Sequence, residues 1–346
     1  MPRIDVQPKI DFNQVLITPK RSNLNSRNEV ELTREFKFKN GQTWCGIPII
    51  SSNMSTIGTF EVYNVLCKYK IVTCFHKFYT LEDYINKKSL LNPEYFMVST
   101  GISDNDFEKL NNICDNINVK WICIDIANGY IPNLLTFCKK VREKYPNKII
   151  VCGNVATSDM VNTLCLECDI DIIKCGIGPG SACTTRIKTG VGIPQLSCIM
   201  DCGDAAHGVG KYIIGDGGIT CPGDLSKAFC GGADFVMMGG VFAGHDENPG
   251  IIIEKIINGK TLKYKEFYGM SSTHAMNKFY GKKENYRSSE GKVVHVSYKG
   301  CLKDTIEDYL GGVRSTCTYI GAKCIKHMPK CTTFVLVTQQ VNNIFT

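Results

Sequence analysis

The sequence has no long apolar run, and this absence limits where the protein can work. Its uninterrupted hydrophobic stretches are far shorter than the roughly 20 residues that a membrane-spanning helix needs. The start of the chain, MPRIDVQPKIDF, also lacks a basic segment followed by an apolar one. We therefore expect no membrane partner and no secretory signal, and the sequence predicts a cytoplasmic protein.

The sequence also lacks any concentrated run of charge. It carries 40 Lys and Arg against 33 Asp and Glu, a formal net charge of +7, and the basic residues are scattered. A nucleic-acid-binding arm would need them clustered. We expect no nucleic-acid partner, whereas a mildly basic balance suits small phosphorylated ligands.

Metal-ligand spacing is missing too, although cysteine is abundant. The six histidines show no ligand spacing, and the pair Cys165 and Cys168 has no second pair beside it. Most of the 19 cysteines lie in apolar contexts, as Cys74, Cys123 and Cys152 do. Such thiols behave as small hydrophobic residues in a reducing cytosol. We expect no transition metal and interpret Cys165 and Cys168 as two structural thiols on a helix.

What the sequence does contain is a regular alternation of short apolar runs and helical periodicity. The eight runs with strand character are Pro48–Ser51, Ile71–Phe75, Tyr95–Ser99, Trp121–Asp125, Ile149–Cys152, Ile172–Cys175, Tyr212–Ile214 and Phe235–Met238. Helical segments between them include Thr59–Lys70, Phe107–Ile117, Ile131–Lys144 and Asp159–Cys168. Eight such units predict an α/β fold, a (β/α)₈ TIM barrel that forms a single domain over residues 1–346. The alternative is a doubly wound open sheet, but no GxGxxG motif follows the first strand.

Three segments lie outside this alternation. Asn40–Gly46 is predicted to form a lead-in hairpin, and Thr332–Val337 a further short strand. Residues 259–300 are polar and rich in glycine and aromatic residues. They follow the eighth strand, where a barrel keeps its catalytic loops. We expect them to form a mobile flap at the active site.

The loop after the sixth strand carries a candidate nucleophile. It reads Gly176-Ile-Gly-Pro-Gly-Ser-Ala-Cys-Thr-Thr-Arg186, and its glycines and proline exclude a helix or strand interior. Cys183, at the end of this rigid loop and close to Arg186, is placed to act as a thiolate nucleophile. The plainer interpretation is a glycine-rich turn with an incidental cysteine. On these local features the two interpretations are about equal.

The next two loops resemble a phosphate site. Asp216-Gly217-Gly218 follows the seventh strand, and Gly239-Gly240 follows the eighth. In barrels these two loops often hold phosphate on backbone amides, and glycine allows the close approach. Asp216, at the end of its strand, could accept hydrogen bonds from ribose hydroxyls. Either glycine pair alone would be an ordinary turn.

A third candidate is Glu290, within the segment Tyr286–Lys292. A glutamate in a polar loop is usually just solvated. The alternatives are a general acid/base and a group that binds the edge of a purine.

Taken together, these stretches resemble the GMP reductase family, in the IMP dehydrogenase/GMP reductase superfamily, over essentially the whole chain. The matching segments are Asp11–Leu16, Lys20–Ser22, Asp125–Tyr130, Gly176–Arg186, Thr189–Leu196, Gly215–Gly218, Gly231–Val236, Phe267–Ser272, Tyr286–Lys292 and Arg314–Tyr319.

The resemblance implies an oxidoreductase of purine salvage, which converts GMP and NADPH to IMP, ammonia and NADP⁺. Cys183 would attack C2 of the purine and form a covalent thioimidate. Thr185 and Glu290 would relay a proton to the departing ammonia, because ammonia leaves poorly unless it is protonated. The thioimidate would then accept a hydride from the nicotinamide, and Cys183 would be expelled.

The resemblance also implies binding residues and a homotetramer in which Ser26 and Arg27 reach the cofactor of a neighbouring subunit. The implied GMP site comprises Asp216, Gly217, Gly218, Gly239, Gly240, Gly269, Met270, Ser271, Arg287, Ser288, Ser289 and Gly291. The implied cofactor site comprises Ser26, Arg27, Lys77, Asp125, Ile126, Ala127, Asn128, Gly178, Pro179, Met270, Tyr286, Arg287, Ser315, Thr316, Cys317 and Thr318. Potassium would be bound at Gly178, Gly180, Cys183 and Arg186, through the carbonyl oxygens of the first three.

The sequence departs from the family pattern in three places. Ser55 stands where the family usually has aspartate, which removes a carboxylate expected near the cofactor. Ser288 stands where the family usually has alanine, and Ala182 where valine is common. None of these changes removes a catalytic group.

Two alternatives remain beside the reductase. An IMP dehydrogenase usually carries a large regulatory insert, for which Leu81–Tyr95 leaves no room, although some lack it. It also activates water with an Arg-Tyr pair, whereas this chain has Tyr286-Arg287 in the opposite order. The other alternative is a catalytically idle purine-nucleotide-binding barrel, because fold alone does not guarantee activity.

Overall fold

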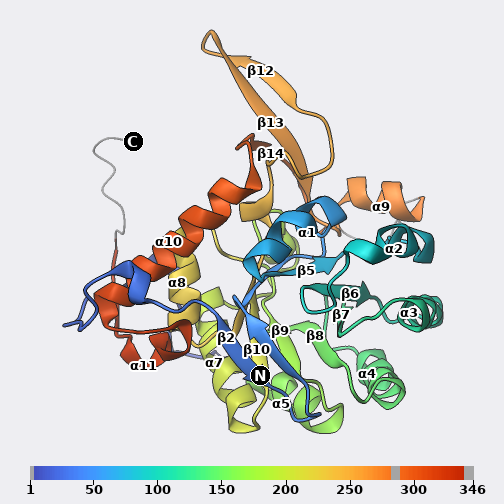
Figure 1. Cartoon of the computed structure of the whole chain (residues 1–346), viewed down its shortest axis with the longest axis horizontal. Coiled ribbons are helices and arrows are strands. Elements are labelled where there is room, and N and C mark those ends of the chain that lie inside the picture. Colours follow the sequence, from blue (N-terminus) through green and yellow to red (C-terminus); the bar gives the residue numbers. More distant parts are fainter. Residues whose placement is uncertain (1–3, 282–288, 339–346) are drawn as a thin grey trace.

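Eight parallel strands close into a barrel in the computed structural model, which describes residues 4–281 and 289–338 (Figure 1). In spatial order the barrel runs β10-β11-β4-β5-β6-β7-β8-β9. The strands are β4 (Ile49–Ser51), β5 (Val72–Phe75), β6 (Phe96–Thr100), β7 (Trp121–Asp125), β8 (Ile149–Val155), β9 (Ile172–Cys175), β10 (Tyr212–Asp216) and β11 (Phe235–Met238). All eight predicted strands are present. The (β/α)₈ barrel is therefore confirmed, and closure decides against the open sheet.

The apolar runs fold this way because each strand buries both of its faces. In β7, Trp121 and Cys123 belong to the core inside the barrel, while Ile122 and Ile124 pack outward against the helices. A strand that is buried on both sides reads as a continuous apolar run, as parallel strands usually do.

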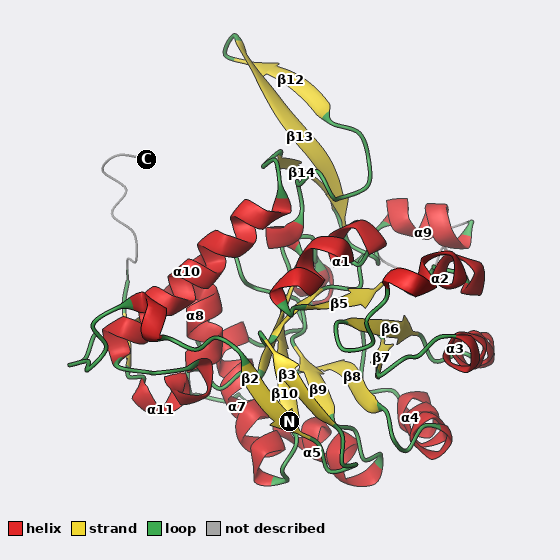
Figure 2. Ribbon diagram, viewed as in Figure 1, coloured by secondary structure: helices red, strands yellow, loops and turns green. Residues whose placement is uncertain are grey.

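The helices surround the strands (Figure 2). They are α1 (Phe60–Leu66), α2 (Leu81–Lys87), α3 (Asp104–Asn116), α4 (Pro132–Lys144), α5 (Ser158–Glu167), α6 (Thr185–Thr189), α7 (Gln195–Gly208), α8 (Pro222–Cys230), α9 (Thr273–Tyr280), α10 (Leu302–Ile320) and α11 (Met328–Cys331). The helix expected over Thr59–Lys70 is shorter than predicted. After α1 the chain forms a 3-10 turn. The helical segment ends at Lys70, whose φ of 57° lies in the left-handed region.

A hairpin covers the amino-terminal end of the barrel. It consists of β2 (Arg34–Lys37) and β3 (Thr43–Gly46), so it begins earlier than the predicted Asn40–Gly46. Phe36 stacks on Phe235 with ring centroids 4.2 Å apart, and Trp44 meets Trp121 edge to face at 5.6 Å. Phe235 and Trp121 are the first residues of their strands, so this end is filled with aromatic rings. A ligand cavity is left to the carboxyl end.

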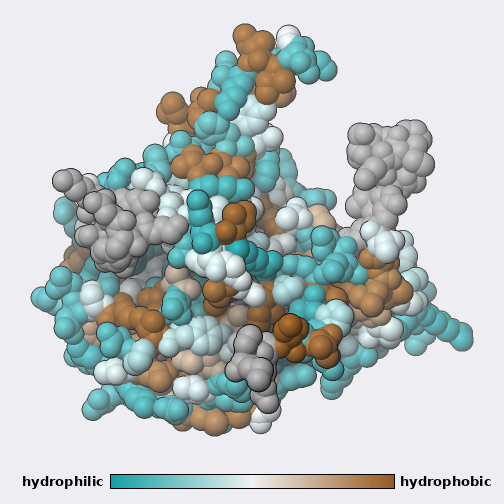
Figure 3. All heavy atoms as spheres, turned by 180° about the vertical axis from the view of Figure 1, so that it is seen from behind, coloured by the Kyte–Doolittle hydropathy of each residue, from teal (hydrophilic) through white to brown (hydrophobic). Residues whose placement is uncertain are grey.

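The segment after the eighth strand forms a sheet that projects from that carboxyl end (Figures 1 and 3). Its strands are β12 (Ile253–Ile257), β13 (Lys260–Tyr268) and β14 (Val293–Ser297), paired antiparallel in that order. The predicted flap of residues 259–300 thus contains two strands and α9, and the sheet begins six residues before it. Near its tip Ile256, Ile257 and Leu262 are exposed.

The two ends of the described chain meet. Strand β1 (Val15–Ile17) pairs antiparallel with β15 (Phe334–Leu336), within the predicted strand Thr332–Val337. All nineteen cysteines lie in the described part of the chain, and none is paired in a disulfide. Cys165 and Cys168 are both buried near the end of α5. Over residues 4–281 and 289–338, none of the helices combines the length and apolarity needed to cross a bilayer.

Candidate active site

A cavity of about 800 Å³ opens where the barrel strands end. Asp125, Asp216 and Met238 are the last residues of β7, β10 and β11, and all three line it. The loop that contains Cys183 and the segment around Met270 complete its wall. Its position is that of the active site in barrel enzymes, and its size suits a drug-sized or nucleotide-sized ligand.

Cys183 is presented to this cavity by a tight turn. Its backbone N–H donates to the carbonyl oxygen of Gly180 at 3.0 Å, and the neighbouring Ala182 is buried. The thiol itself is only half-buried and lines the cavity. The predicted nucleophile is therefore accessible to a ligand, in contrast to the buried thiols of Cys175 and Cys198.

A chain of hydrogen bonds leads away from the thiol. Sγ of Cys183 donates to Oγ1 of Thr185 at 3.2 Å, and that hydroxyl donates to Oε2 of Glu290 at 2.7 Å. All three residues line the cavity. A thiol, a hydroxyl and a carboxylate in series can pass a proton in either direction, as nucleophile activation or acid catalysis requires.

Glu290 reaches this position because the flap pairs with the cysteine loop. The N–H of Thr184 donates to the carbonyl oxygen of Glu290 at 2.8 Å, and that of Lys292 to the carbonyl oxygen of Ala182 at 3.0 Å. Cys183 and Gly291 form an antiparallel bridge between them. These backbone contacts hold Glu290 beside the cysteine loop and so position its carboxylate.

The glycine loops after β10 and β11 lie along one side of the cavity. Gly217 and Gly218 both have φ of +84°, a conformation that favours glycine. A Cβ on Gly239 would lie 3.0 Å from Oγ of Ser52, and one on Gly240 only 2.5 Å from Oγ of Ser181. These loops approach their surroundings so closely that only glycine fits without displacement. The N–H of Gly217 donates to the carbonyl oxygen of Met237 at 3.2 Å, so an anion here would depend on the other backbone amides of the two loops.

The floor of the cavity is a charged layer around Lys174, a residue that sequence reasoning did not assign to the site. Nζ of Lys174 is 2.6 Å from Oδ1 of Asp125 and 2.8 Å from Oδ2 of Asp216. Asn53 donates to Asp125 at 2.8 Å, and Asn154 to Asp216 at 2.9 Å. The sequence signal for this layer was a lysine in an otherwise apolar strand, on the same inward face as Ile172. We interpreted that segment only as a strand.

The charges in this layer support one another. Burial lowers the pKa of Lys174, but the charges of Asp125 and Asp216 outweigh it and raise that pKa well above its ordinary value. Burial raises the pKa of Asp125, but the charge of Lys174 and hydrogen bonds from Lys174 and Asn53 outweigh it and leave that pKa lowered. Both ion-pair partners therefore stay charged at neutral pH.

The cavity wall also holds residues that the resemblance assigned to the cofactor. Those that line the cavity are Lys77, Asp125, Ile126, Ala127, Gly178, Pro179 and Met270. Phe78 also lines it and stacks on Phe279 of α9, with ring centroids 3.8 Å apart and an interplanar angle of 11°. The flap helix thus packs directly on the loop after β5.

Ser55 does not line the cavity. It is buried, and its hydroxyl donates to that of Tyr268 at 3.0 Å, which also accepts from Nζ of Lys278 at 3.2 Å. Ser55 therefore anchors the end of β13 rather than leaving a gap in the cavity wall.

Some assigned residues lie away from this cavity. Ser26 and Arg27 are exposed on a 3-10 turn, Arg27–Glu29, that packs against α10, where Ser315–Thr318 lie. Thr316 bonds Ser226 at 2.9 Å, and the thiol of Cys317 is buried in the core. The 3-10 turn and α10 therefore meet outside the cavity.

The remaining assigned residues lie in the cavity wall, beside the cavity, or outside the described residues. Ser271, Gly269 and Gly291 line the cavity, whereas Asn128 and Ser289 do not. Arg186 folds across its own loop and donates to the carbonyl oxygen of Ile193 at 2.6 Å. Tyr286, Arg287 and Ser288 lie outside the described residues.

Comparison with known proteins gives the same family along the whole chain. The profile of the IMP dehydrogenase / GMP reductase domain matches residues 9–343. GMP reductase 2 of Homo sapiens is 54% identical over 350 aligned positions, covering 100% of this chain and 99% of that protein. GMP reductase of Caenorhabditis elegans is 50% identical, with coverages of 100% and 96%, and that of Aliivibrio salmonicida (strain LFI1238) is 51% identical, with coverages of 99% and 99%. The family predicted from the motifs is confirmed: the chain belongs to the IMP dehydrogenase/GMP reductase family.

Proposed function

We propose that this protein is a GMP reductase, which converts GMP to IMP with NADPH and releases ammonia in purine salvage. The curated relatives described above carry that name. The observation that carries the proposal is the hydrogen-bonded series Cys183, Thr185 and Glu290 at one cavity wall. It supplies both the nucleophile and the acid that removal of an amino group requires.

The first half of the reaction forms a bond to sulfur and breaks a bond to nitrogen. The thiolate of Cys183 adds to C2 of GMP. Protonated Glu290 passes its proton through Thr185 to the 2-amino group, which leaves as ammonia, and Glu290 afterwards takes up a proton from solvent. The purine is left joined to Cys183 as a thioimidate, so the carboxyl group serves as the acid.

The second half replaces sulfur by hydrogen. NADPH, when bound, supplies a hydride to C2, and the thiolate of Cys183 leaves as IMP forms. Over the whole cycle GMP, NADPH and two protons give IMP, NADP⁺ and ammonium. Glu290 is not needed for this half, because neither bond change transfers a proton at C2.

Both ligands are assigned to this one cavity. Asp216 and the glycine pairs 217–218 and 239–240 hold ribose and phosphate, and Gly269–Ser271 together with 287–291 complete the GMP site. Lys77, Asp125–Asn128, Gly178–Pro179 and 286–287 hold the cofactor, with Met270 between the two ligands. The division is supported by the strands involved, because Lys77 and Asp125 belong to the β5 and β7 side, whereas the glycine pairs follow β10 and β11. We propose that the flap moves to admit and release them.

We propose a potassium ion at the cysteine loop, held by carbonyl oxygens of Gly178, Gly180 and Cys183 with Arg186 alongside. Carbonyl oxygens are hard ligands that suit such a cation. The loop fits this role in part. Gly178 has φ of +82°, which turns its peptide units out of the usual directions, but the Gly180 carbonyl already accepts from Cys183. Over residues 4–281 and 289–338 there is no cluster of three or more His, Cys, Asp or Glu that could hold a metal.

We also propose a cytoplasmic homotetramer whose subunits share the cofactor site. Ser26, Arg27 and Ser315–Thr318 meet on a face away from their own cavity, which supports contact with a neighbour's cofactor. Sedimentation of the protein with and without NADPH measures the assembly.

The function is tested by incubating the purified protein separately with GMP plus NADPH and with IMP plus NAD⁺. Consumption of NADPH with ammonia release in the first mixture is expected. Formation of NADH in the second mixture alone would establish the dehydrogenase. Binding of GMP without turnover in either mixture would establish the idle nucleotide-binding barrel.

A further inference from the structure

Lys174 touches both sides of the cavity floor although no step above uses it. It lies on β9, while Asp125 ends β7 and Asp216 ends β10, so three strands contribute to one contact. Its side chain is only 3% exposed, whereas those of Asp125 and Asp216 are 31% and 20% exposed and face the cavity. All three residues line the cavity, with the lysine almost fully buried in its floor and the two carboxylates more exposed.

We propose that Lys174 is a positioning residue that aligns Asp216 toward the nucleotide ribose and Asp125 toward the cofactor at the same time. This inference deepens the proposed function and rests on its assignment of the two carboxylates. It makes one buried cation responsible for the affinity of both ligands. Lys174 itself need touch neither of them.

The physical reason is the closeness of the two carboxylates. Both lie within 2.8 Å of one nitrogen, so without a cation between them they would share a low-dielectric site as two like charges. Two such carboxylates cannot both stay ionised, and one takes up a proton. A protonated Asp216 would be a poorer acceptor for ribose hydroxyls, because hydrogen bonds to charged groups are the stronger ones.

No other described group replaces Lys174 at this place. Asn53 donates to Oδ2 of Asp125 and Asn154 to Oδ2 of Asp216, but neither amide carries a charge. The thiols of Cys74 on β5 and Cys123 on β7 also interact with Lys174, but a thiol carries no positive charge that could replace it. Lys77 acts on Asp125 electrostatically from the loop after β5, on the cofactor side alone. Removal of Lys174 therefore exposes each carboxylate to the other.

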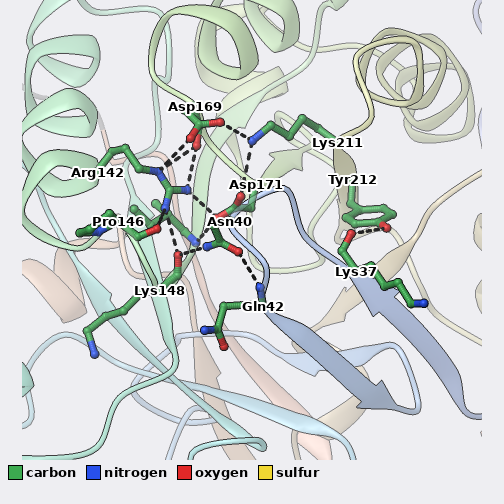
Figure 4. A network of polar contacts seen from close by, with 11 residues as sticks. Lys37, Asn40, Gln42, Arg142, Pro146, Lys148, Asp169, Asp171, Lys211 and Tyr212 are labelled. Atoms are coloured by element: carbon green, nitrogen blue, oxygen red, sulfur yellow. Dashed lines mark hydrogen bonds and ion pairs between the residues drawn. The ribbon is translucent and has the colours of Figure 1, made fainter.

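The chain offers a matched control at the opposite end of the barrel. Lys211 is also 3% exposed and also bridges two carboxylates, with Nζ 2.6 Å from Oδ1 of Asp169 and 3.5 Å from Oδ1 of Asp171 (Figure 4). Arg142 joins the same network, far from the cavity wall. Replacing Lys211 removes an equally buried lysine from between two carboxylates without disturbing a ligand site.

The experiment compares Lys174→Met, Lys174→Arg and Lys211→Met with the unmodified enzyme. KM for GMP and for NADPH are measured from about pH 5.5 to about pH 8.5, beside thermal unfolding. Lys174→Met is expected to raise KM for GMP about 10- to 100-fold near neutral pH, which is the effect expected from losing hydrogen bonds to a charged acceptor. That KM should fall again as pH rises and the second carboxylate ionises, and KM for NADPH should rise as well.

The other two variants separate positioning from stability. Lys174→Arg keeps the cation and is expected to retain the flat pH profile of the unmodified enzyme. Lys211→Met should unfold at a lower temperature with both KM values unchanged. A flat KM–pH profile in Lys174→Met, or an equal loss of affinity in Lys211→Met, would overturn the proposal.

Should Lys174→Met fail to fold, Lys174→Met combined with Asp125→Asn provides the test. The double change removes the cation together with one of the two like charges, so Asp216 stays ionised, and the proposal requires GMP binding, measured by calorimetry without any cofactor present, to vary with pH no more than in the unmodified enzyme. GMP binding by the double variant that weakens as pH falls, beyond any weakening in the unmodified enzyme, overturns the proposal. Calorimetry also separates this outcome from the proposed function, because GMP binding is measured whether or not the unmodified enzyme consumes NADPH.

Discussion

Thr185 donates a 2.7 Å hydrogen bond to Glu290, a residue 105 positions further along the chain. Thr185 is the first residue of α6, directly after the cysteine loop, whereas Glu290 lies on the flap segment that precedes β14. The backbone of Thr184 holds the same flap residue at 2.8 Å. Glu290 therefore reaches Thr185 through the pairing of the flap with the cysteine loop, and in the proposed mechanism this pairing would couple closure of the site to its chemistry.

Replacing the nucleophile should separate binding from turnover. Cys183→Ala is expected to abolish NADPH consumption while GMP still binds, because the thiol forms the covalent bond and the glycine loops hold the phosphate. Cys221, which is exposed and lies outside the cavity wall, provides the control as Cys221→Ala. Near-normal turnover in Cys183→Ala would contradict a covalent mechanism.

Removing the acid should slow ammonia release far more than hydride transfer. Glu290→Gln keeps the size of the side chain but cannot exchange a proton, and a positioned acid contributes about 10²- to 10⁴-fold in rate. Without ammonia, IMP plus NADP⁺ can still form the thioimidate and NADPH and then stop. We expect Glu290→Gln to retain this burst of NADPH while GMP reduction collapses. If the burst disappears together with turnover, Glu290 serves binding or hydride transfer instead.

The glycine loop after β11 should matter for phosphate specifically. A Cβ on Gly239 would already lie 3.0 Å from Ser52 and 3.2 Å from Met54, so Gly239→Val must displace the loop. The loss of a charge-assisted contact predicts about 10- to 100-fold weaker GMP binding, with guanosine affected much less. Gly208→Val is the control, since a Cβ there meets open space. Equal losses for both ligands in calorimetry would remove the phosphate assignment.

The anchor between Ser55 and Tyr268 should affect the flap. Tyr268→Phe removes the hydroxyl that accepts from Ser55 at 3.0 Å and from Lys278 at 3.2 Å. We expect KM for NADPH to rise about 2- to 10-fold, which corresponds to the loss of one ordinary hydrogen bond, because the flap contributes to the proposed cofactor site. Tyr264→Phe, earlier on the same strand, is the matched control. A KM for NADPH that does not respond would mean that the anchor has no part in closure.

Stability should fall in acid because of His76. Burial lowers the pKa of this imidazole to about 4, and its ring stacks on Tyr79 at 3.9 Å. The unfolded chain binds a proton near the ordinary pKa of about 6.5, so the stability is complete above that value and is lost as pH falls toward 4. The loss between about pH 7 and pH 5 is about 2 kcal/mol.

Urea unfolding at the two pH values measures this loss. His76→Gln should lose about 2 kcal/mol less than the unmodified protein between them, because its side chain does not titrate. The exposed His327→Gln should behave like the unmodified protein. An unchanged pH dependence in His76→Gln would show that His76 is not the group responsible.

The sequence by itself determined the barrel and was enough to propose the reacting residues. Strands such as Trp121–Asp125 are buried on both faces, so their apolar runs are visible without knowledge of their neighbours. Cys183, Thr185 and the glycine loops lie within short, continuous motifs, whose local geometry is set by the residues themselves. Glu290 was found by resemblance, since an isolated glutamate in a polar loop has no local signal.

Only the tertiary structure decided what depends on residues from several strands or from distant segments. Lys174 meets Asp125 and Asp216 because barrel closure brings β7, β9 and β10 into one layer, and no sequence spacing encodes that contact. Ser55 turns toward Tyr268 of the flap, which its place in the motif after β4 did not reveal. Strand and turn propensities act over a few residues, whereas the charge balance of a buried layer is set by side chains that meet only after the barrel has closed.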